Sequence, residues 1–151
     1  MGYIEEIRQL VGHRPLILVG SVVIIESGGK VLFQKRNETN ERWGLIGGLM
    51  EIGESAEETA RREAFEETGL HVGNLRLVGV FSGADYFIRA QNGDEFFAVN
   101  IVYATNDFYG NLTINDHESL ALRFFRPEEL PGNIAKSHRT IFEHYKTHFI
   151  D

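Results

Sequence analysis

Apolar positions recur along this chain with two different spacings, and each spacing predicts a different kind of element. In residues 3–11, isoleucine, leucine and valine recur at helical spacing, which predicts a short opening helix. Runs rich in β-branched and aromatic residues follow, bounded by glycine, asparagine or proline, and such runs predict strands. The expected strands cover residues 16–26, 31–35, 75–81, 96–104 and 120–125.

A helix over residues 56–68 is the clearest expected element. Ser55 with Glu58 three residues later matches a capping box, and Gly69 follows the last periodic position as a C′ glycine does. Small residues recur every four positions between these signals, so one narrow side of the helix can lie close to a sheet. The residues of this stripe, with a phenylalanine beside them, are Ala56, Ala60, Ala64 and Phe65.

The order of the elements predicts an α+β fold in one domain over residues 1–151. Glycines at 28 and 29 turn the first two strands into a hairpin, and residues 92–94 provide a second turn. A helical turn at 127–130 and a closing helix over 134–149 complete the expected elements. Strands therefore come early and late around a central helix, which indicates a mixed β-sheet between helices, an α-β-α sandwich.

Composition restricts the class of protein. With 42% hydrophobic and 25% charged residues among 151, the chain is typical of a soluble globular protein. The longest apolar run is too short to span a bilayer, and the first residues lack the pattern of a signal peptide, so no membrane partner is expected. The chain has no cysteine, which excludes disulfides and thiolate chemistry, and a cytoplasmic location is expected.

Charge argues against a nucleic-acid polymer as partner. The net charge is −7, and only 15 lysines and arginines are spread along the chain. Polymer binding depends on neutralising many phosphates with such residues. A small nucleotide-like substrate remains compatible, because bound metal ions can supply positive charge locally. The sequence leaves a homodimer open.

Three carboxylates share one face of the central helix, since Glu63, Glu66 and Glu67 are spaced i, i+3 and i+4. A solvated acidic face held by ion pairs is one interpretation. Two such pairs are available, Glu57 with Arg61 and Glu58 with Arg62. Glu63 and Glu67, however, oppose each other at a like-charge spacing that costs about 0.2–0.5 kcal/mol. A divalent cation would reverse that repulsion, and the helix alone leaves both interpretations open.

Glycines before the helix favour the metal interpretation. Gly47 and Gly48 precede it by a short loop, and Gly53 leads into its first turn. Such residues let backbone groups approach a ligand closely, and amides at a helix N-terminus attract phosphate oxygens, although a glycine pair alone is usually a tight turn. Glycine loop, helix and acid cluster occur within one block of 23 residues.

This block resembles the signature of the Nudix hydrolase (MutT-like) family. The pattern is Gly, five residues, Glu, seven residues, Arg-Glu, an aliphatic-type position, any residue, Glu-Glu, any residue, Gly and an aliphatic residue. Every specified position is met, with Ala64 at the aliphatic-type position, and a chance match is expected in fewer than about one chain in a million. Ile46 departs from the proline that often precedes the two glycines. Residues 48–70 read Gly-Leu-Met-Glu-Ile-Gly-Glu-Ser-Ala-Glu-Glu-Thr-Ala-Arg-Arg-Glu-Ala-Phe-Glu-Glu-Thr-Gly-Leu.

The resemblance implies the Nudix fold and a set of metal ligands for Mg²⁺ or Mn²⁺. Three glutamates would bind the metal and serve catalysis, and they are Glu63, Glu66 and Glu67. The carbonyl of Gly47 or Gly48 would complete the shell. Arg62 and Glu54 resemble the supporting pair of the family, which holds the ligand carboxylates in position.

Residues outside the signature are less specific candidates. Glu118, on a loop before the last strand, is the expected general base, with an ordinary loop acid as the alternative and His117 as a weaker candidate. Tyr86, Phe81 and Arg89 are candidate substrate residues, although aromatic side chains in strands more often belong to the core. Tyr86 lies 16 residues after the signature, where a tyrosine marks dinucleoside polyphosphate hydrolases. Residues 84 and 85 are alanine and aspartate, whereas a proline there would resemble the ADP-ribose branch, so the resemblance favours substrates other than ADP-ribose.

The function implied is hydrolysis of a phosphoanhydride (pyrophosphate) bond in a nucleoside diphosphate derivative. Nucleoside triphosphates, dinucleoside polyphosphates and nucleotide sugars all fit this description. The alternative is a non-catalytic Nudix domain that senses a nucleotide, but degenerate domains of that kind usually lose signature carboxylates and this chain keeps them all. A purely structural acidic helix predicts that metal and nucleotide leave the melting temperature unchanged.

Overall fold

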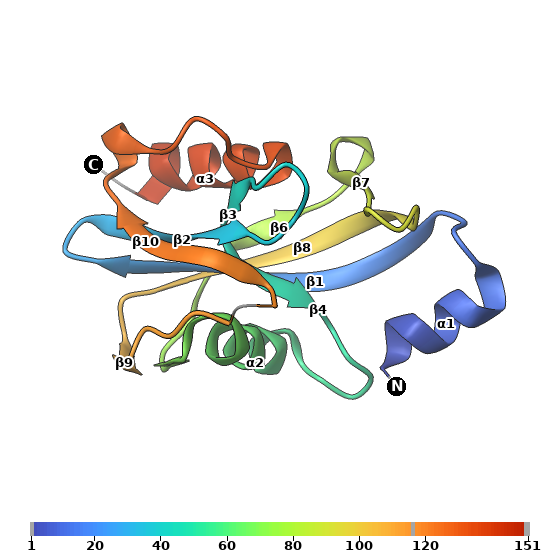
Figure 1. Cartoon of the computed structure of the whole chain (residues 1–151). Coiled ribbons are helices and arrows are strands. Elements are labelled where there is room, and N and C mark those ends of the chain that lie inside the picture. The colour runs from blue at the N-terminus through green and yellow to red at the C-terminus, as the bar shows by residue number, and fades with distance from the viewer. Residues whose placement is uncertain (1, 116, 150–151) are drawn as a thin grey trace.

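A computed structural model describes residues 2–115 and 117–149, and Figure 1 shows a β-sheet between two helices. The helix α2 covers one face of the sheet and α3 covers the other, while α1 lies at the side of the molecule. The helices are α1 (Tyr3–Val11), α2 (Ala56–Thr68) and α3 (Lys136–Phe149), with short 3₁₀ turns η1 (Ala84–Tyr86) and η2 (Pro127–Glu129). The expected α-β-α sandwich with a mixed sheet is confirmed.

In that part of the chain the main sheet has eight strands. Five of them form its path in the order β10-β2-β1-β8-β6, and three short strands each pair with one inner strand of this path. The five are β10 (Ser119–Phe125), β2 (Lys30–Arg36), β1 (Leu16–Ser27), β8 (Glu95–Thr105) and β6 (Arg76–Phe81). The short strands are β3 (Trp43–Gly44), β4 (Ile46–Leu49) and β7 (Phe87–Arg89), and β5 (Leu70–Val72) with β9 (Phe108–Gly110) forms a separate pair.

The strand β1 organises the sheet because it changes partner along its length. It runs parallel to β8 from Leu16 to Ile25, and β4 pairs antiparallel with its middle residues 20–23. Only its end, at Glu26 and Ser27, pairs with β2 in the predicted hairpin. The sheet therefore divides at the middle of β1, and β4 occupies the opening on the side where α2 packs.

Two apolar cores lie on opposite sides of the sheet. The core on the α3 side includes Phe33, Phe142 and Tyr145, and the core on the α2 side includes Ala60 and Ala64. Both alanines are fully buried, as the small-residue stripe predicts. Phe65 differs, because it is 50% exposed and its ring contacts that of His71 in a tilted arrangement, with 4.7 Å between ring centroids. One residue beyond Ala64 is a rotation of about 100° around the helix, which turns this ring away from the sheet.

The ends of α2 agree with the sequence signals. Ser55 accepts a hydrogen bond from the Glu58 amide at 3.0 Å, and Glu58 accepts one from the Ser55 amide at 2.9 Å. Gly69 has the left-handed conformation, with φ of 78°, that ends a helix at a glycine. The helix is therefore fixed at both ends, with its acidic side in a defined position. Within the described residues, no helix is long and apolar enough to cross a membrane.

Candidate active site

The glycine pair of β4 brings backbone next to the acidic helix. Gly47 and Gly48 lie opposite Val22 and Ser21 in the antiparallel register with β1. A Cβ atom on Gly47 would collide with the Ser21 carbonyl oxygen. A Cβ atom on Gly48 would collide with the carboxylate of Glu63. Larger residues would therefore force β4 away from β1 or from α2, and the close approach requires glycine.

Glu67 of α2 is a buried acid that lines a cleft together with the glycine pair. The residue is only 7% exposed. One carboxylate oxygen accepts a hydrogen bond from the Gly47 amide at 2.8 Å, and the other accepts one from Gln34 Nε2 at 2.9 Å. Gln34 is itself oriented by Ser119, whose hydroxyl donates to Gln34 Oε1 at 2.6 Å. Three strands thus fix the direction of one carboxylate.

Burial raises the pKa of Glu67 from its ordinary value of 4.5 to about 8. Hydrogen bonds from Gln34 and the Gly47 amide favour the charged form but do not offset the loss of solvent. The charges of Glu63 and Glu118 raise the pKa further. The hydrogen bonds that the protein supplies therefore do not fully stabilise a negative charge in this cleft, as expected of a site that receives a cation.

Glu63 and Glu118 face the same cleft as Glu67. Burial also raises the pKa of Glu63, against the opposing charge of Arg62, and Glu118 adds to the rise. The cleft has a volume of about 420 Å³. Its lining residues are Gln34, Arg36, Asn37, Glu38, Gly47, Gly48, Glu63, Glu67 and Glu118. The structure thus brings the expected base candidate together with two of the three signature glutamates.

Glu66 lies outside this cleft and is more exposed than the other two acids. Arg62 Nη1 contacts both Glu63, at 2.9 Å, and Glu66, at 3.2 Å, so these two carboxylates are neighbours across one guanidinium. Across residues 2–115 and 117–149, no three acidic or histidine side chains are arranged as a group that could hold a metal ion. Arg62 Nη1 contacts only one oxygen of each carboxylate, Oε1 of Glu63 and Oε2 of Glu66, so each side chain keeps a second oxygen that could bind an ion.

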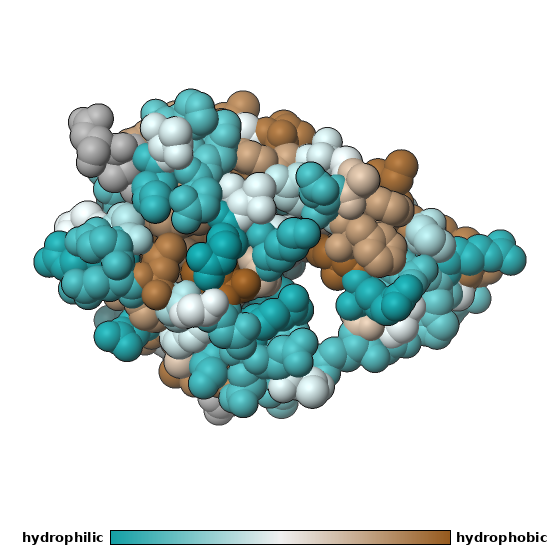
Figure 2. Space-filling model, turned by 90° about the horizontal axis from the view of Figure 1, so that it is seen from above, coloured by the Kyte–Doolittle hydropathy of each residue, from teal (hydrophilic) through white to brown (hydrophobic). Residues whose placement is uncertain are grey.

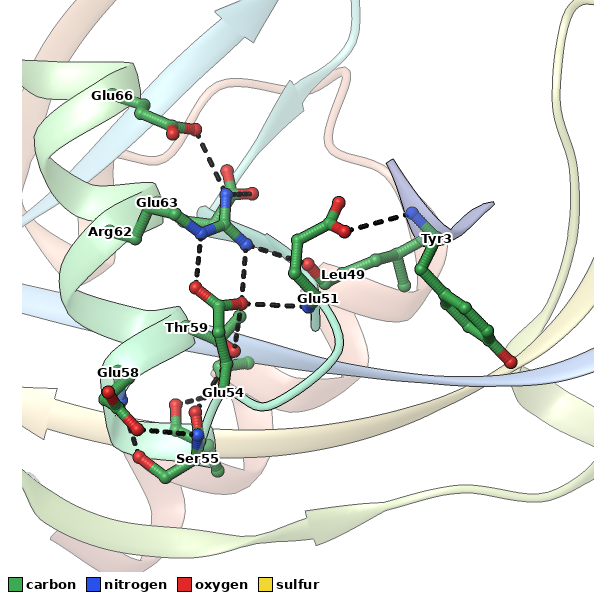
Figure 3. A network of polar contacts seen from close by, with 12 residues as sticks. Tyr3, Leu49, Glu51, Glu54, Ser55, Glu58, Thr59, Arg62, Glu63 and Glu66 are labelled. Atoms are coloured by element: carbon green, nitrogen blue, oxygen red, sulfur yellow. Dashed lines mark hydrogen bonds and ion pairs between the residues drawn. The ribbon is translucent and has the colours of Figure 1, made fainter. Parts of the chain in front are cut away.

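Arg62 forms its shortest ion pair with Glu54, and Figure 3 shows this pair at the centre of a polar network. Arg62 Nε and Nη2 donate to the two oxygens of Glu54 at 2.6 and 3.0 Å. The hydrogen bonds from Arg62 lower the pKa of Glu54 to about 2, and the same contacts raise the pKa of Arg62. Arg62 Nη2 also donates to the Leu49 carbonyl at 3.0 Å, which joins α2 to the end of β4.

A second cavity of about 400 Å³ adjoins the acidic cleft. Both are lined by Arg36, Glu38 and the glycine pair, so they meet at β4. Thr39 and Gln91 join the two loops that line the second cavity, through a hydrogen bond of 2.7 Å. Its other lining residues include Arg42, Arg89, Phe96, Asn100 and His138. This cavity provides room for a small organic molecule beside the carboxylates.

Comparison with known proteins decides the family. A family model described as NUDIX domain matches residues 16–145. The chain belongs to the Nudix family. It is 35% identical over 124 residues to an ADP-ribose pyrophosphatase of Methanocaldococcus jannaschii, which covers 81% of this chain and 69% of that protein. It is also 37% identical over 76 residues to an NAD-capped RNA hydrolase NudC of Actinobacillus succinogenes, covering 45% of this chain and 29% of that protein.

A solved structure shows the same relationship. The crystal structure of a MutT NUDIX hydrolase from Burkholderia pseudomallei aligns with a TM-score of 0.72 and 29% identity, covering 85% of this chain and 98% of that one. The Nudix fold inferred from the signature is therefore confirmed. The match to the family model starts at residue 16, so α1 precedes the matched part of the chain.

The three candidate substrate residues of this Nudix domain have different environments. Tyr86 is only 7% exposed and belongs to the core on the α3 side. Phe81 packs against that core, with ring contacts to Tyr86 and His144 at 6.4 and 5.1 Å between centroids. Neither ring lines either of these two cavities, so their positions fit the core alternative, and a stacking role for them stays a prediction. Arg89 lines the second cavity and pairs with Glu95 through its Nε at 2.8 Å.

Several residues of the site lie far from the signature and could not be predicted from it. Gln34 and Ser119 orient Glu67, and no local pattern marks either of them. His138 of α3 reaches the second cavity, where its Nδ1 accepts a hydrogen bond from the Leu45 amide at 2.8 Å. Burial and the charge of Arg36 hold the pKa of His138 well below 6.5, so this imidazole is neutral. His117 contacts its neighbours through its backbone and does not line the cleft.

In metal-free protein, Glu67 should make folding less stable as the pH rises toward 8. Its folded pKa of about 8 lies above the ordinary 4.5, so the folded state keeps a proton that the unfolded chain has lost. This contribution is complete below pH 4.5 and disappears as the pH rises through about 8. The lowered pKa of His138 acts in the opposite direction, but only below its ordinary value of 6.5.

Between pH 6.5 and 8 the opposing contribution of His138 is therefore absent, and comparison with a Glu67 variant identifies the contribution of Glu67. We expect the melting temperature in EDTA to fall across this window for the wild-type protein, and Glu67→Gln to reduce the slope. Calorimetry of both proteins at matched ionic strength measures the difference. Equal slopes for the two proteins would show that Glu67 is already ionised at pH 6.5.

Proposed function

We propose that this Nudix hydrolase cleaves a pyrophosphate bond in a nucleoside diphosphate derivative, with Mg²⁺ or Mn²⁺ held by Glu63, Glu66 and Glu67. The observation that carries the proposal is the junction of two spaces at Gly47 and Gly48. One space holds buried acids, and the other has room for a nucleoside. A pyrophosphate that crosses the junction would have its reactive phosphorus beside the carboxylates.

The residues present fit a hard divalent cation. All candidate ligands are oxygen atoms, from carboxylates and the carbonyl of Gly47 or Gly48, and Mg²⁺ and Mn²⁺ prefer such ligands. The raised pKa values of Glu63 and Glu67 indicate negative charge that a cation would relieve. Gly48 leaves open the space that a Cβ atom would take from the Glu63 carboxylate.

The side chains divide the work of the proposed reaction. A bound divalent cation would neutralise phosphate charge and lower the pKa of a water molecule. Glu54 fixes the guanidinium of Arg62, and Arg62 in turn holds Glu63 and Glu66 as neighbours. Glu118, across the cleft, is the proposed base that accepts the proton of the attacking water. The products would be a nucleoside monophosphate and a second phosphorylated compound or pyrophosphate.

The substrate range includes ADP-ribose. The relative from Methanocaldococcus jannaschii bears the name ADP-ribose pyrophosphatase, which supports this substrate. The position of Tyr86 in the sequence favours dinucleoside polyphosphates instead, and with Tyr86 buried in the core that preference stays a prediction. Both classes therefore belong in the test, together with nucleoside triphosphates and nucleotide sugars.

A hydrolysis screen tests the proposal. The purified protein is incubated with each substrate class in Mg²⁺, in Mn²⁺ and in EDTA, and the products are separated by chromatography. We expect cleavage of at least one pyrophosphate compound with metal and none in EDTA. The sensing alternative predicts metal-dependent binding, seen as a higher melting temperature with nucleotide, without any product. Cleavage that persists in EDTA would contradict the metal requirement.

A further inference from the structure

The N-terminal helix α1 meets the signature loop at Glu51, as Figure 3 shows for its first residue, Tyr3. Glu51 Oε2 accepts a hydrogen bond from the Tyr3 amide at 3.1 Å, although 48 residues separate the two. Gly2, the N-cap residue, offers no side-chain cap of its own. Its backbone lies so close that an added Cβ atom would stand 3.0 Å from Glu51 Oε1. Glu51 therefore caps α1 from a distant loop.

A carboxylate at this position is favourable for the helix and for the loop. The first amides of a helix lack partners within it, and the positive end of its dipole attracts an anion. No residue of α1 is buried, so contacts at its two ends contribute more to holding the helix in place than packing along its length does. The other end is held by Arg8, whose Nη2 donates to the Glu95 carbonyl at 2.6 Å. Figure 2 shows an opening in the surface on the right-hand side, where α1 lies in Figure 1.

The same glutamate is linked inward to the supporting ion pair. The Glu51 amide donates to Glu54 Oε1 at 2.8 Å, and the Glu54 amide donates to the Glu51 carbonyl at 3.1 Å. These two hydrogen bonds close a turn over residues 51–54 in which Gly53 has a positive φ of 87°. Glu54 then binds Arg62, and Arg62 contacts the carboxylate of Glu63. A continuous series of contacts therefore runs from α1 to the acidic cleft.

We propose that Glu51 is a positioning residue, through which α1 holds the 51–54 turn and keeps Glu54 and Arg62 aligned with the acidic cleft. The proposal rests on the proposed metal-dependent function, because its consequence is the affinity of that cleft for a divalent ion. The helix would fix the direction of the Glu54 carboxylate, and a fixed Glu54 limits the orientations open to Arg62. Releasing α1 should thus weaken metal binding without removing any ligand.

The principal test compares Mn²⁺ binding by wild-type protein and Glu51→Ala, measured from the electron paramagnetic resonance signal of free Mn²⁺. Outer-shell partners typically change metal affinity by about 10–100-fold, and Glu51 is one contact further out, so we expect a loss of about three- to tenfold. Glu5→Gln is the matched control, since it removes a charge from the first turn of the same helix at an exposed position. That variant should bind Mn²⁺ as the wild type does.

A double variant separates positioning from simple stabilisation of α1. In Glu51→Ala/Gly2→Ser, the serine provides a local cap for the helix but no link to the loop. We expect the melting temperature to recover while Mn²⁺ affinity stays weak. Recovery of wild-type affinity would overturn the proposal, because Glu51 would then act only by keeping α1 folded. Unchanged affinity in the single Glu51→Ala variant would overturn it as well.

A measurement without metal distinguishes this proposal from the proposed function. The Arg62 Nε–H proton, which is hydrogen-bonded to Glu54, can be followed by NMR in EDTA. We expect faster exchange of this proton with solvent in Glu51→Ala and no change in Glu5→Gln. If wild-type protein binds no Mn²⁺, the metal function fails, and the exchange rate still decides whether α1 positions Arg62.

Discussion

Replacing Glu67 with glutamine should remove nearly all turnover while leaving the protein folded. The substitution keeps the shape of the side chain and one oxygen that can accept from the Gly47 amide. It removes the buried charge that would attract a cation into the cleft. We expect a loss of about a thousandfold or more in kcat, which corresponds to about 4 kcal/mol of transition-state stabilisation. Steady-state kinetics with the best substrate of the screen, at saturating Mn²⁺, measures the effect.

The matched control for this variant is Glu57→Gln on the same helix. Glu57 is exposed and pairs with Arg61 at 3.6 Å, away from the cleft. Such an exposed pair contributes at most about 1 kcal/mol, so the control should keep wild-type turnover. Near-normal activity of Glu67→Gln, with its circular dichroism spectrum unchanged, would remove Glu67 from the catalytic site.

Long elements and helix ends could be predicted from sequence because their signals are local. The capping box at Ser55 and the glycine at 69 define α2 without reference to the rest of the chain. The short strands β3 and β4 could not be predicted, since they contain only two and four residues, half of them glycine. They form strands because β2 and β1 provide partners for their backbone.

The candidate site was predictable to the extent that it lies in one continuous segment. Spacing alone placed Glu63 and Glu67 on one side of a helix, and the structure places both in one cleft. The exposure of Glu66 could not be foreseen, because it depends on how α2 is rotated against β4. The role of Gln34 in orienting Glu67 was equally hidden, since 33 residues separate them and a sheet contact brings them together.

Replacing Glu118 with glutamine should have the second large effect on turnover. If this residue is the general base, Glu118→Gln should lower kcat by about 10²–10⁴-fold, the usual contribution of positioned proton transfer. Its position supports the role, because its charge acts on both Glu63 and Glu67 from across the cleft. The residual rate should increase with pH, since hydroxide can replace water that lacks a base. Initial rates from pH 6 to 9 measure both effects.

Mn²⁺ affinity decides between a base and a metal ligand at this position. A base can be lost without removing a metal ligand, so Glu118→Gln should bind Mn²⁺ with an affinity close to that of wild-type protein, whereas loss of a ligand should weaken binding strongly. His117→Gln serves as the control from the same loop, because His117 does not line the cleft and its loss should leave turnover unchanged. A large loss of turnover in His117→Gln, with Glu118→Gln still active, would transfer the role of base to the histidine.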